Sequence, residues 1–135
     1  MRRMLTAAVV FVAFLAGDAY ARDARKSDVQ NTSWSIEHIN GSTPTVHASV
    51  LFGSEYRISG STGCNPFYGK YGEDGKDVFI GAVTAANGPC ENAAAQQAAI
   101  LAIMNSDPTI TVQQNGKLEV KSNAGASIIL SPSRS

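Results

Sequence analysis

The stretch at residues 63–69, GCNPFYG, places a cysteine between residues that form turns. Glycine adopts backbone conformations that other residues avoid, and asparagine and proline favour turn positions. Residues 67–71 and 78–83 then flank residues 73–76 (EDGK), in which Asp-Gly supplies the positive φ of a tight hairpin turn. The stretch therefore predicts a turn that contains Cys64 and leads into a β-hairpin.

Short strands separated by turn residues account for most of the remaining chain. The strongest hairpin signal is the Asn-Gly pair at residues 115–116, between apolar runs at 110–112 and 118–121. The sequence predicts about eight strands: five before residue 91 and three after residue 108. The predicted strands are at residues 34–38, 46–52, 56–58, 67–71, 78–83, 110–112, 118–121 and 127–130.

One helix is predicted between the two groups of strands, in the alanine-rich stretch at residues 91–108. Ile100, Leu101 and Met104 share one face at helical spacing, and the Asp-Pro pair at residues 107–108 ends the helix. Strands grouped on both sides of one helix predict an α+β domain. We expect a curled, mostly antiparallel sheet with the helix packed on it.

Residues 1–21 have the pattern of a secretory signal peptide. Two arginines precede an apolar run at residues 5–16, and a small-x-small cleavage site ends at Ala21. The run is too short for a membrane span, which takes roughly 20 apolar residues. Asp18 stands where a bacterial lipoprotein signal has its lipidated cysteine. We therefore expect a mature form without a membrane anchor, either periplasmic or secreted.

The chain has two cysteines, Cys64 and Cys90, both in loop-like sequence. In an exported chain this count is most simply a disulfide, because oxidising compartments form and keep such bridges. The bridge would close a loop of about 27 residues, worth roughly 3.5 kcal/mol in the chain-entropy model. A catalytic thiol would instead need His38 or His47 as a neighbouring base. A zinc site would need ligand pairs separated by only two to four residues, and no two of the cysteines and histidines have that spacing. We expect no catalytic residue and no metal site.

Cleavage after Ala21 would leave nine basic and ten acidic residues, a net charge near −1. This balance offers neither the basic surface that binds nucleic acid nor a polybasic membrane patch. Residues 22–32, RDARKSDVQNT, are mostly polar and charged, and we interpret them as a flexible leader. The folded domain is then expected to span residues 33–131.

Several motifs follow one another along residues 33–130. Trp34 opens a strand that leads to the turn at residues 40–41, and Cys90 precedes the alanine-rich helix. The densest group of motif residues consists of Gly63, Cys64, Asn65, Phe67, Gly69 and Tyr71. In this order the residues resemble the META domain family of HslJ-like heat-shock proteins, over nearly the whole predicted domain.

The resemblance implies a curled, incompletely closed barrel with one helix, similar to pilot proteins that escort secretins. It also implies a role in the cell envelope linked to heat or antibiotic stress, and it implies no enzymatic activity. We expect no cofactor. In such a fold the motif glycines would let the chain bend around Cys64, and the bridge to Cys90 would staple that bend to the helix start. One departure is that Gln96 and Gln97 stand where the family's helix often carries a glutamate.

Two functional hypotheses remain. We favour a monomer that binds a protein partner in the cell envelope through aromatic residues, for which the candidates are Tyr56, Phe67, Tyr68 and Tyr71. The alternative is a carrier of a small apolar ligand, such as a lipid or acyl chain, held in a barrel cavity. The residues expected to line that cavity are Val50, Phe52, Ile100 and Met104.

Overall fold

The structure is a computed structural model that describes residues 21–75 and 77–133. The predicted signal peptide, apart from Ala21, lies outside the described residues. In chain order the elements are β1 (Arg22–Asp23), α1 (Lys26–Val29), β2 (Thr32–Ile39), β3 (Ser49–Phe52), the 3-10 helix η2 (Ser54–Tyr56), β4 (Arg57–Ser61), β5 (Pro66–Asp74), β6 (Asp77–Ala85), α2 (Ala94–Met104), β7 (Thr109–Val112), β8 (Leu118–Lys121) and β9 (Ser127–Pro132). Within the described part of the chain, no helix is both long and apolar enough to cross a membrane.

The strands form one sheet in the order β1-β7-β8-β9-β2-β3-β4-β5-β6. Every neighbouring pair is antiparallel. The sheet curls until β6 approaches β7 without forming a ladder with it, so the barrel is nearly closed. This confirms the predicted fold class, with β1 as an additional short strand among the described residues.

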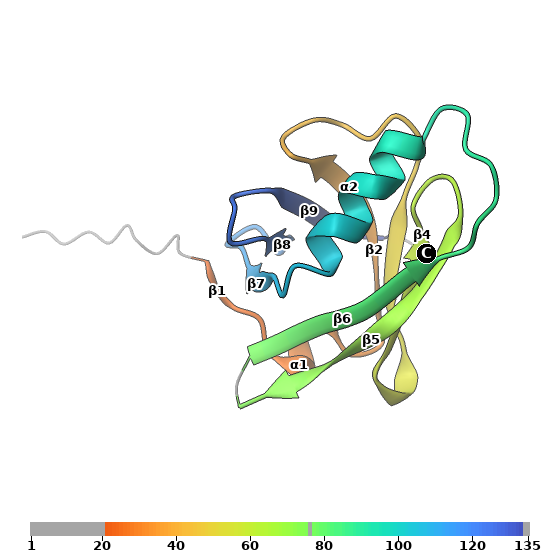
Figure 1. Cartoon of the computed structure of the whole chain (residues 1–135). Helices are drawn as coiled ribbons and strands as arrows, with labels where there is room; N and C mark the ends of the chain where they lie inside the picture. The colour runs from red at the N-terminus through yellow and green to blue at the C-terminus, as the bar shows by residue number, and fades with distance from the viewer. Residues whose placement is uncertain (1–20, 76, 134–135) are drawn as a thin grey trace, which may run out of the picture.

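The helix α2 packs on the curled sheet. It contacts β6 on one side and β2, β8 and β9 on the other, and Figure 1 shows it lying across the gap between these two groups of strands. Ile100, Ile103 and Met104 are its buried side chains, while Leu101 is only partly buried. The helix therefore closes the open side of the barrel over the core.

The core is continuous and consists of apolar side chains from nearly every strand together with α2. Alternate residues of β6 illustrate how it forms, because Val78 and Ile80 are buried whereas Phe79 between them is exposed. The largest fully buried side chains are Phe52, Phe67, Ile58, Ile100, Met104, Leu118, Ile128 and Leu130.

Residues 22–31 form an ordered part of the domain, which corrects the prediction of a flexible leader at residues 22–32. The strand β1 pairs with β7, and the N–H of Ala24 donates to the carbonyl of Ile110 at 2.9 Å. Ala24 and Val29 are fully buried. Burial of these two side chains and pairing with a free strand edge offset the entropy of ordering this segment, so the described domain begins at Arg22. We call residues 22–31 the α1 segment.

Candidate functional site

The disulfide joins two loops at one end of β5. Cys64 and Cys90 are bridged, with their Cα atoms 5.4 Å apart, as the cysteine count predicted. Cys64 lies in the turn before β5, and Cys90 lies in the loop that leads to α2. We call the turn at residues 62–65, the loop at residues 86–93 and the glutamines of α2 the disulfide corner.

Asn65 holds the two loops of the disulfide corner together beside the bridge. Its side chain is buried, its Oδ1 accepts from the N–H of Gly88 at 3.1 Å, and its Nδ2 donates to the Gly88 carbonyl at 3.0 Å. Nδ2 also lies 3.3 Å from Oε1 of Gln97. The Asn65 side chain thus pairs with both backbone groups of Gly88, as a neighbouring strand would, and its role is structural.

Gln96 connects α2 to the disulfide corner through both ends of its amide. Oε1 accepts from the N–H groups of Thr45 at 2.8 Å and Val46 at 3.2 Å. Nε2 donates to the carbonyls of Val46 and Thr62, each at 2.7 Å. A carboxylate could accept but not donate here, so this geometry explains why glutamine rather than glutamate suits the position.

The remaining motif residues are also structural. Gly63 has φ +98°, a backbone conformation that favours glycine, and a Cβ at this position would also meet the side-chain amide of Gln96. Phe67 and Tyr71 are buried in the core, and Gly69 pairs with Ile58 of β4. The Tyr71 hydroxyl donates to the carbonyl of Gly53 at 2.6 Å. The motif builds a corner and a core; within the described residues, no group of three or more His, Cys, Asp or Glu side chains could hold a metal ion.

The four residues predicted to line a barrel cavity are in the core. Val50, Phe52, Ile100 and Met104 are at most 1% exposed and belong to one cluster of buried side chains. Four pockets on the described surface, of about 240, 200, 420 and 360 Å³, are lined by other residues. The structure thus brings these four together as packing partners.

The predicted aromatic set divides into core and surface residues. Phe67 and Tyr71 are buried, whereas Tyr56 is 47% exposed and Tyr68 is 60% exposed. Phe79, which no sequence pattern indicated as a surface residue, is 41% exposed. The ring of Tyr71 packs edge-on against Phe52, with centroids 5.1 Å apart, and against Tyr56 at 5.7 Å. A row of aromatic rings therefore runs from the core to the surface.

A surface pocket of about 360 Å³ lies where this row emerges. Its lining consists of Tyr56, Tyr71, Gly72, Glu73 and Phe79, and we call it the aromatic pocket. Phe79 of β6 is paired with Gly72 of β5, and a Cβ on Gly72 would lie 2.9 Å from the Phe79 ring. Glycine at this position therefore lets the ring lie directly against the backbone of the neighbouring strand.

The backbone at Tyr56 is strained. Glu55 has φ +58° and Tyr56 has φ +59°, so two consecutive residues other than glycine occupy the left-handed region. Such strain persists only where surrounding contacts enforce it, and it is frequent at binding sites. Here the strain accompanies the placement of the Tyr56 ring against Tyr71 at the rim of the aromatic pocket.

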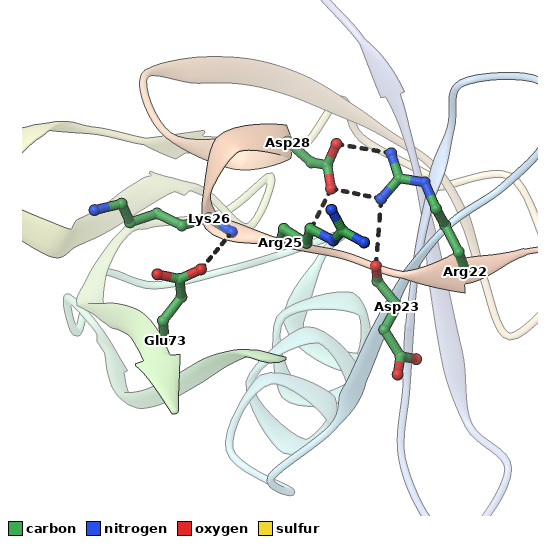
Figure 2. A network of polar contacts seen from close by, with 6 residues as sticks. All are labelled: Arg22, Asp23, Arg25, Lys26, Asp28 and Glu73. Atoms are coloured by element: carbon green, nitrogen blue, oxygen red, sulfur yellow. Dashed lines mark hydrogen bonds and ion pairs between the residues drawn. The ribbon is translucent and has the colours of Figure 1, made fainter. Parts of the chain in front are cut away.

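The α1 segment is anchored beside this rim by the polar network in Figure 2. Arg22 donates to both carboxylate oxygens of Asp28, at 2.8 and 2.9 Å, and Asp28 also accepts from the N–H of Arg25 at 2.8 Å. The hydrogen bond from Arg22 holds the pKa of Asp28 below its usual value. The N–H of Lys26 donates to Glu73 at 3.1 Å, which joins α1 to the end of β5.

The side chain of Lys26 also reaches the aromatic pocket. Its Nζ donates to the Tyr56 hydroxyl at 3.0 Å and lies 5.2 Å from the centroid of that ring. The hydrogen bond to Tyr56 raises the pKa of Lys26. Burial raises the pKa of Tyr71, which also lines the pocket. Among the described residues, the aromatic pocket thus combines exposed aromatic rings, one carboxylate and a neighbouring ammonium group.

Comparison with known proteins gives one match to a family and one to a solved structure. The sequence model of the META domain family matches residues 27–135. Among curated proteins, no sequence matches the chain. The NMR structure of a protein from Burkholderia xenovorans is similar, with a TM-score of 0.63 and 12% sequence identity, covering 100% of each chain. At that identity the likeness shows a shared fold alone.

Proposed function

This chain belongs to the META domain family, and on that premise we propose that it is an exported, non-catalytic protein of the cell envelope that acts by binding a partner protein. Export is supported by the signal-peptide pattern of residues 1–21 and by the Cys64–Cys90 disulfide, since disulfides persist in oxidising compartments outside the cytoplasm. We further propose that the binding serves a response to envelope stress, as the resemblance to HslJ-like proteins suggests.

A non-catalytic role is supported by the positions of the reactive side chains. Both cysteines are held in the disulfide, so neither is available as a nucleophile. The META domain is not a known enzyme family. The polar side chains of the disulfide corner are occupied by structural hydrogen bonds, as Asn65 and Gln96 illustrate. These observations favour a binding function over a catalytic function.

The observation that carries the proposal is the aromatic pocket. A single exposed apolar side chain is ordinary, but here Tyr56 and Phe79 flank one open pocket beside a strained backbone. Aromatic residues, tyrosine among them, are enriched in the energetically important centres of protein interfaces. The pocket is therefore the surface at which we expect a partner to be anchored.

The proposal is tested by comparing variants in envelope extracts of the producing cell. Proteins crosslinked to the wild type are quantified against those crosslinked to the double variant Tyr56→Ala, Phe79→Ala. Tyr68→Ala serves as a matched control, because Tyr68 is also an exposed aromatic but lies outside the pocket. We expect a partner captured by the wild type and the control to be lost with the double variant. Equal capture by all three, or an uncleaved chain retained in the cytoplasm, would contradict the proposal.

A carrier of a small apolar ligand is a second candidate, favoured by a different surface. A groove of about 420 Å³ lies between the C-terminal half of α2 and the turn from β8 to β9, and Ala102, Ile103, Ala124 and Ala126 form its apolar part. Native mass spectrometry of protein purified from the envelope tests this function. A bound mass that leaves on denaturation would favour the carrier, and a bare protein would favour partner binding.

A further inference from the structure

The aromatic pocket has walls suited to an organic cation. The faces of aromatic rings carry negative electrostatic potential and attract ammonium groups within about 6 Å of the ring centre. Tyr56 and Phe79 expose their rings at the pocket, and Glu73 contributes a carboxylate to the same lining. Among the described residues, Glu73 forms no ion pair; its carboxylate accepts a hydrogen bond from the backbone N–H of Lys26 at 3.1 Å. A cation bound in the pocket would interact favourably with the ring faces and with the Glu73 carboxylate at the same time.

The chain itself already places one ammonium group at this wall. Nζ of Lys26 is 3.0 Å from the Tyr56 hydroxyl and 5.2 Å from the ring centroid. Lys26 belongs to the short α1 helix, whose backbone is attached to Glu73 independently of the lysine side chain. The ammonium group could therefore leave Tyr56 while α1 stays in place.

We propose that the aromatic pocket binds a primary ammonium group, supplied by a lysine side chain of a partner protein, and that Lys26 competes for it from within the chain. This inference rests on the proposed partner-binding function. A basic segment of a protein is favoured over a lipid surface, because Asp74 and Asp77 at the adjacent β5–β6 hairpin are exposed acidic residues. Such residues attract lysine-rich protein segments and repel anionic membranes.

The direct test is a titration of the protein purified from the envelope, followed by NMR of its backbone amides at constant ionic strength. The probe is N-acetyl-lysine methylamide, and N-acetyl-norleucine methylamide is the matched neutral control. We expect saturable shifts with the lysine compound at Tyr56, Gly72, Glu73 and Phe79, and none with norleucine. Equal shifts with both compounds, or shifts centred elsewhere, would overturn the inference.

Variants identify the competing group. Lys26→Met keeps an aliphatic stem but removes the charge, and we expect it to strengthen binding about threefold, the scale of an exposed cation–π contact. Phe79→Ala and Glu73→Gln should each weaken binding by about threefold or more. Tyr68→Ala should leave binding unchanged, and dispersed amide spectra establish that every variant is folded. Weaker binding by Lys26→Met would exclude a competing role for Lys26.

Two further outcomes separate this inference from the proposed function. If the lysine compound does not bind but Tyr56→Ala, Phe79→Ala still loses a captured partner, the partner-binding function stands and the ammonium assignment fails. If the protein instead sediments with vesicles containing phosphatidylethanolamine, and not with phosphatidylcholine vesicles, the ammonium group is a lipid headgroup and the assignment to a partner protein is overturned.

Discussion

The disulfide corner and the α1 segment lie near opposite ends of β5 and are held in different ways. At the corner a covalent bridge joins Cys64 to Cys90, and the side-chain amides of Asn65 and Gln96 form hydrogen bonds with the surrounding backbone. The α1 segment has two buried apolar side chains, a two-residue strand pairing and one partly exposed ion pair, Arg22–Asp28. The corner constrains the unfolded chain, whereas the α1 segment depends on native contacts alone. The α1 segment should therefore contribute less than the corner to the free energy of unfolding, and a single substitution should be enough to detach it.

The largest effect is expected from removing the bridge. Cys64→Ser with Cys90→Ser should lower the free energy of unfolding by about 3.5 kcal/mol, because the unfolded chain regains the freedom of the closed loop. Denaturant unfolding measures this change, and reduction of the wild type should reproduce it. A loss below about 1 kcal/mol would mean that the corner is held by its amides and not by the bridge.

The side-chain amide of Gln96 in α2 comes next. Gln96→Glu should cost about 2 kcal/mol, because the carbonyls of Val46 and Thr62 both lose their donor. Glu91→Gln is the control, since Glu91 is exposed at the same corner and its substitution should change stability by less than about 0.5 kcal/mol. Denaturant unfolding of both variants under one set of conditions gives the comparison, and equal stabilities would show that Gln96 does not hold the corner.

The α1 segment responds to Val29→Ala. The side chain is fully buried, so the loss of its methyl groups should cost about 1.5 kcal/mol. Hydrogen exchange should also become faster at Ala24, whose N–H pairs with Ile110 of β7. Gln30→Ala, at an exposed neighbouring position, should have little effect. Unchanged stability with Val29→Ala would restore the interpretation of this segment as a flexible leader.

The smallest effect concerns pH. The hydrogen bond from Arg22 lowers the pKa of Asp28. The ionised form of Asp28 is therefore favoured over its protonated form more in the folded state than in the unfolded state. Its contribution to stability is therefore present above the unfolded pKa of about 4 and is lost as pH falls through the lower folded pKa. Asp28→Asn should remove this part of the pH dependence in thermal unfolding between about pH 5 and pH 2. Parallel pH profiles of variant and wild type would exclude the ion pair as a stabilising contact.

Turn chemistry made much of the fold predictable. The Asp-Gly pair at residues 74–75 and the Asn-Gly pair at residues 115–116 connect β5 to β6 and β7 to β8, as expected. Glycine in both turns has positive φ, at Gly75 and Gly116. These are local preferences of the backbone, which is why the sequence alone reveals them.

The aromatic pocket was only partly predictable. Tyr56 was a candidate, but Phe79 lies between Val78 and Ile80 in an apolar run, and nothing in the sequence says which of the three faces solvent. A signal existed in Gly72, since a glycine inside a strand often marks a place where another group approaches closely. Its pairing with Phe79 becomes visible only through the register of β5 and β6.

By itself, the sequence determined the strands other than β1, the hairpin turns, the single main helix, the pairing of two cysteines and the family. The tertiary structure decided the surroundings of individual side chains: Ala24 and Val29 are buried within a mostly polar segment, Phe79 is exposed, and the partly buried amide of Gln96 is hydrogen-bonded inside the corner. The physical reason is that turns and disulfides depend on residue type and compartment. Burial depends instead on which strands become neighbours, and β1 meets β7 from the far end of the chain.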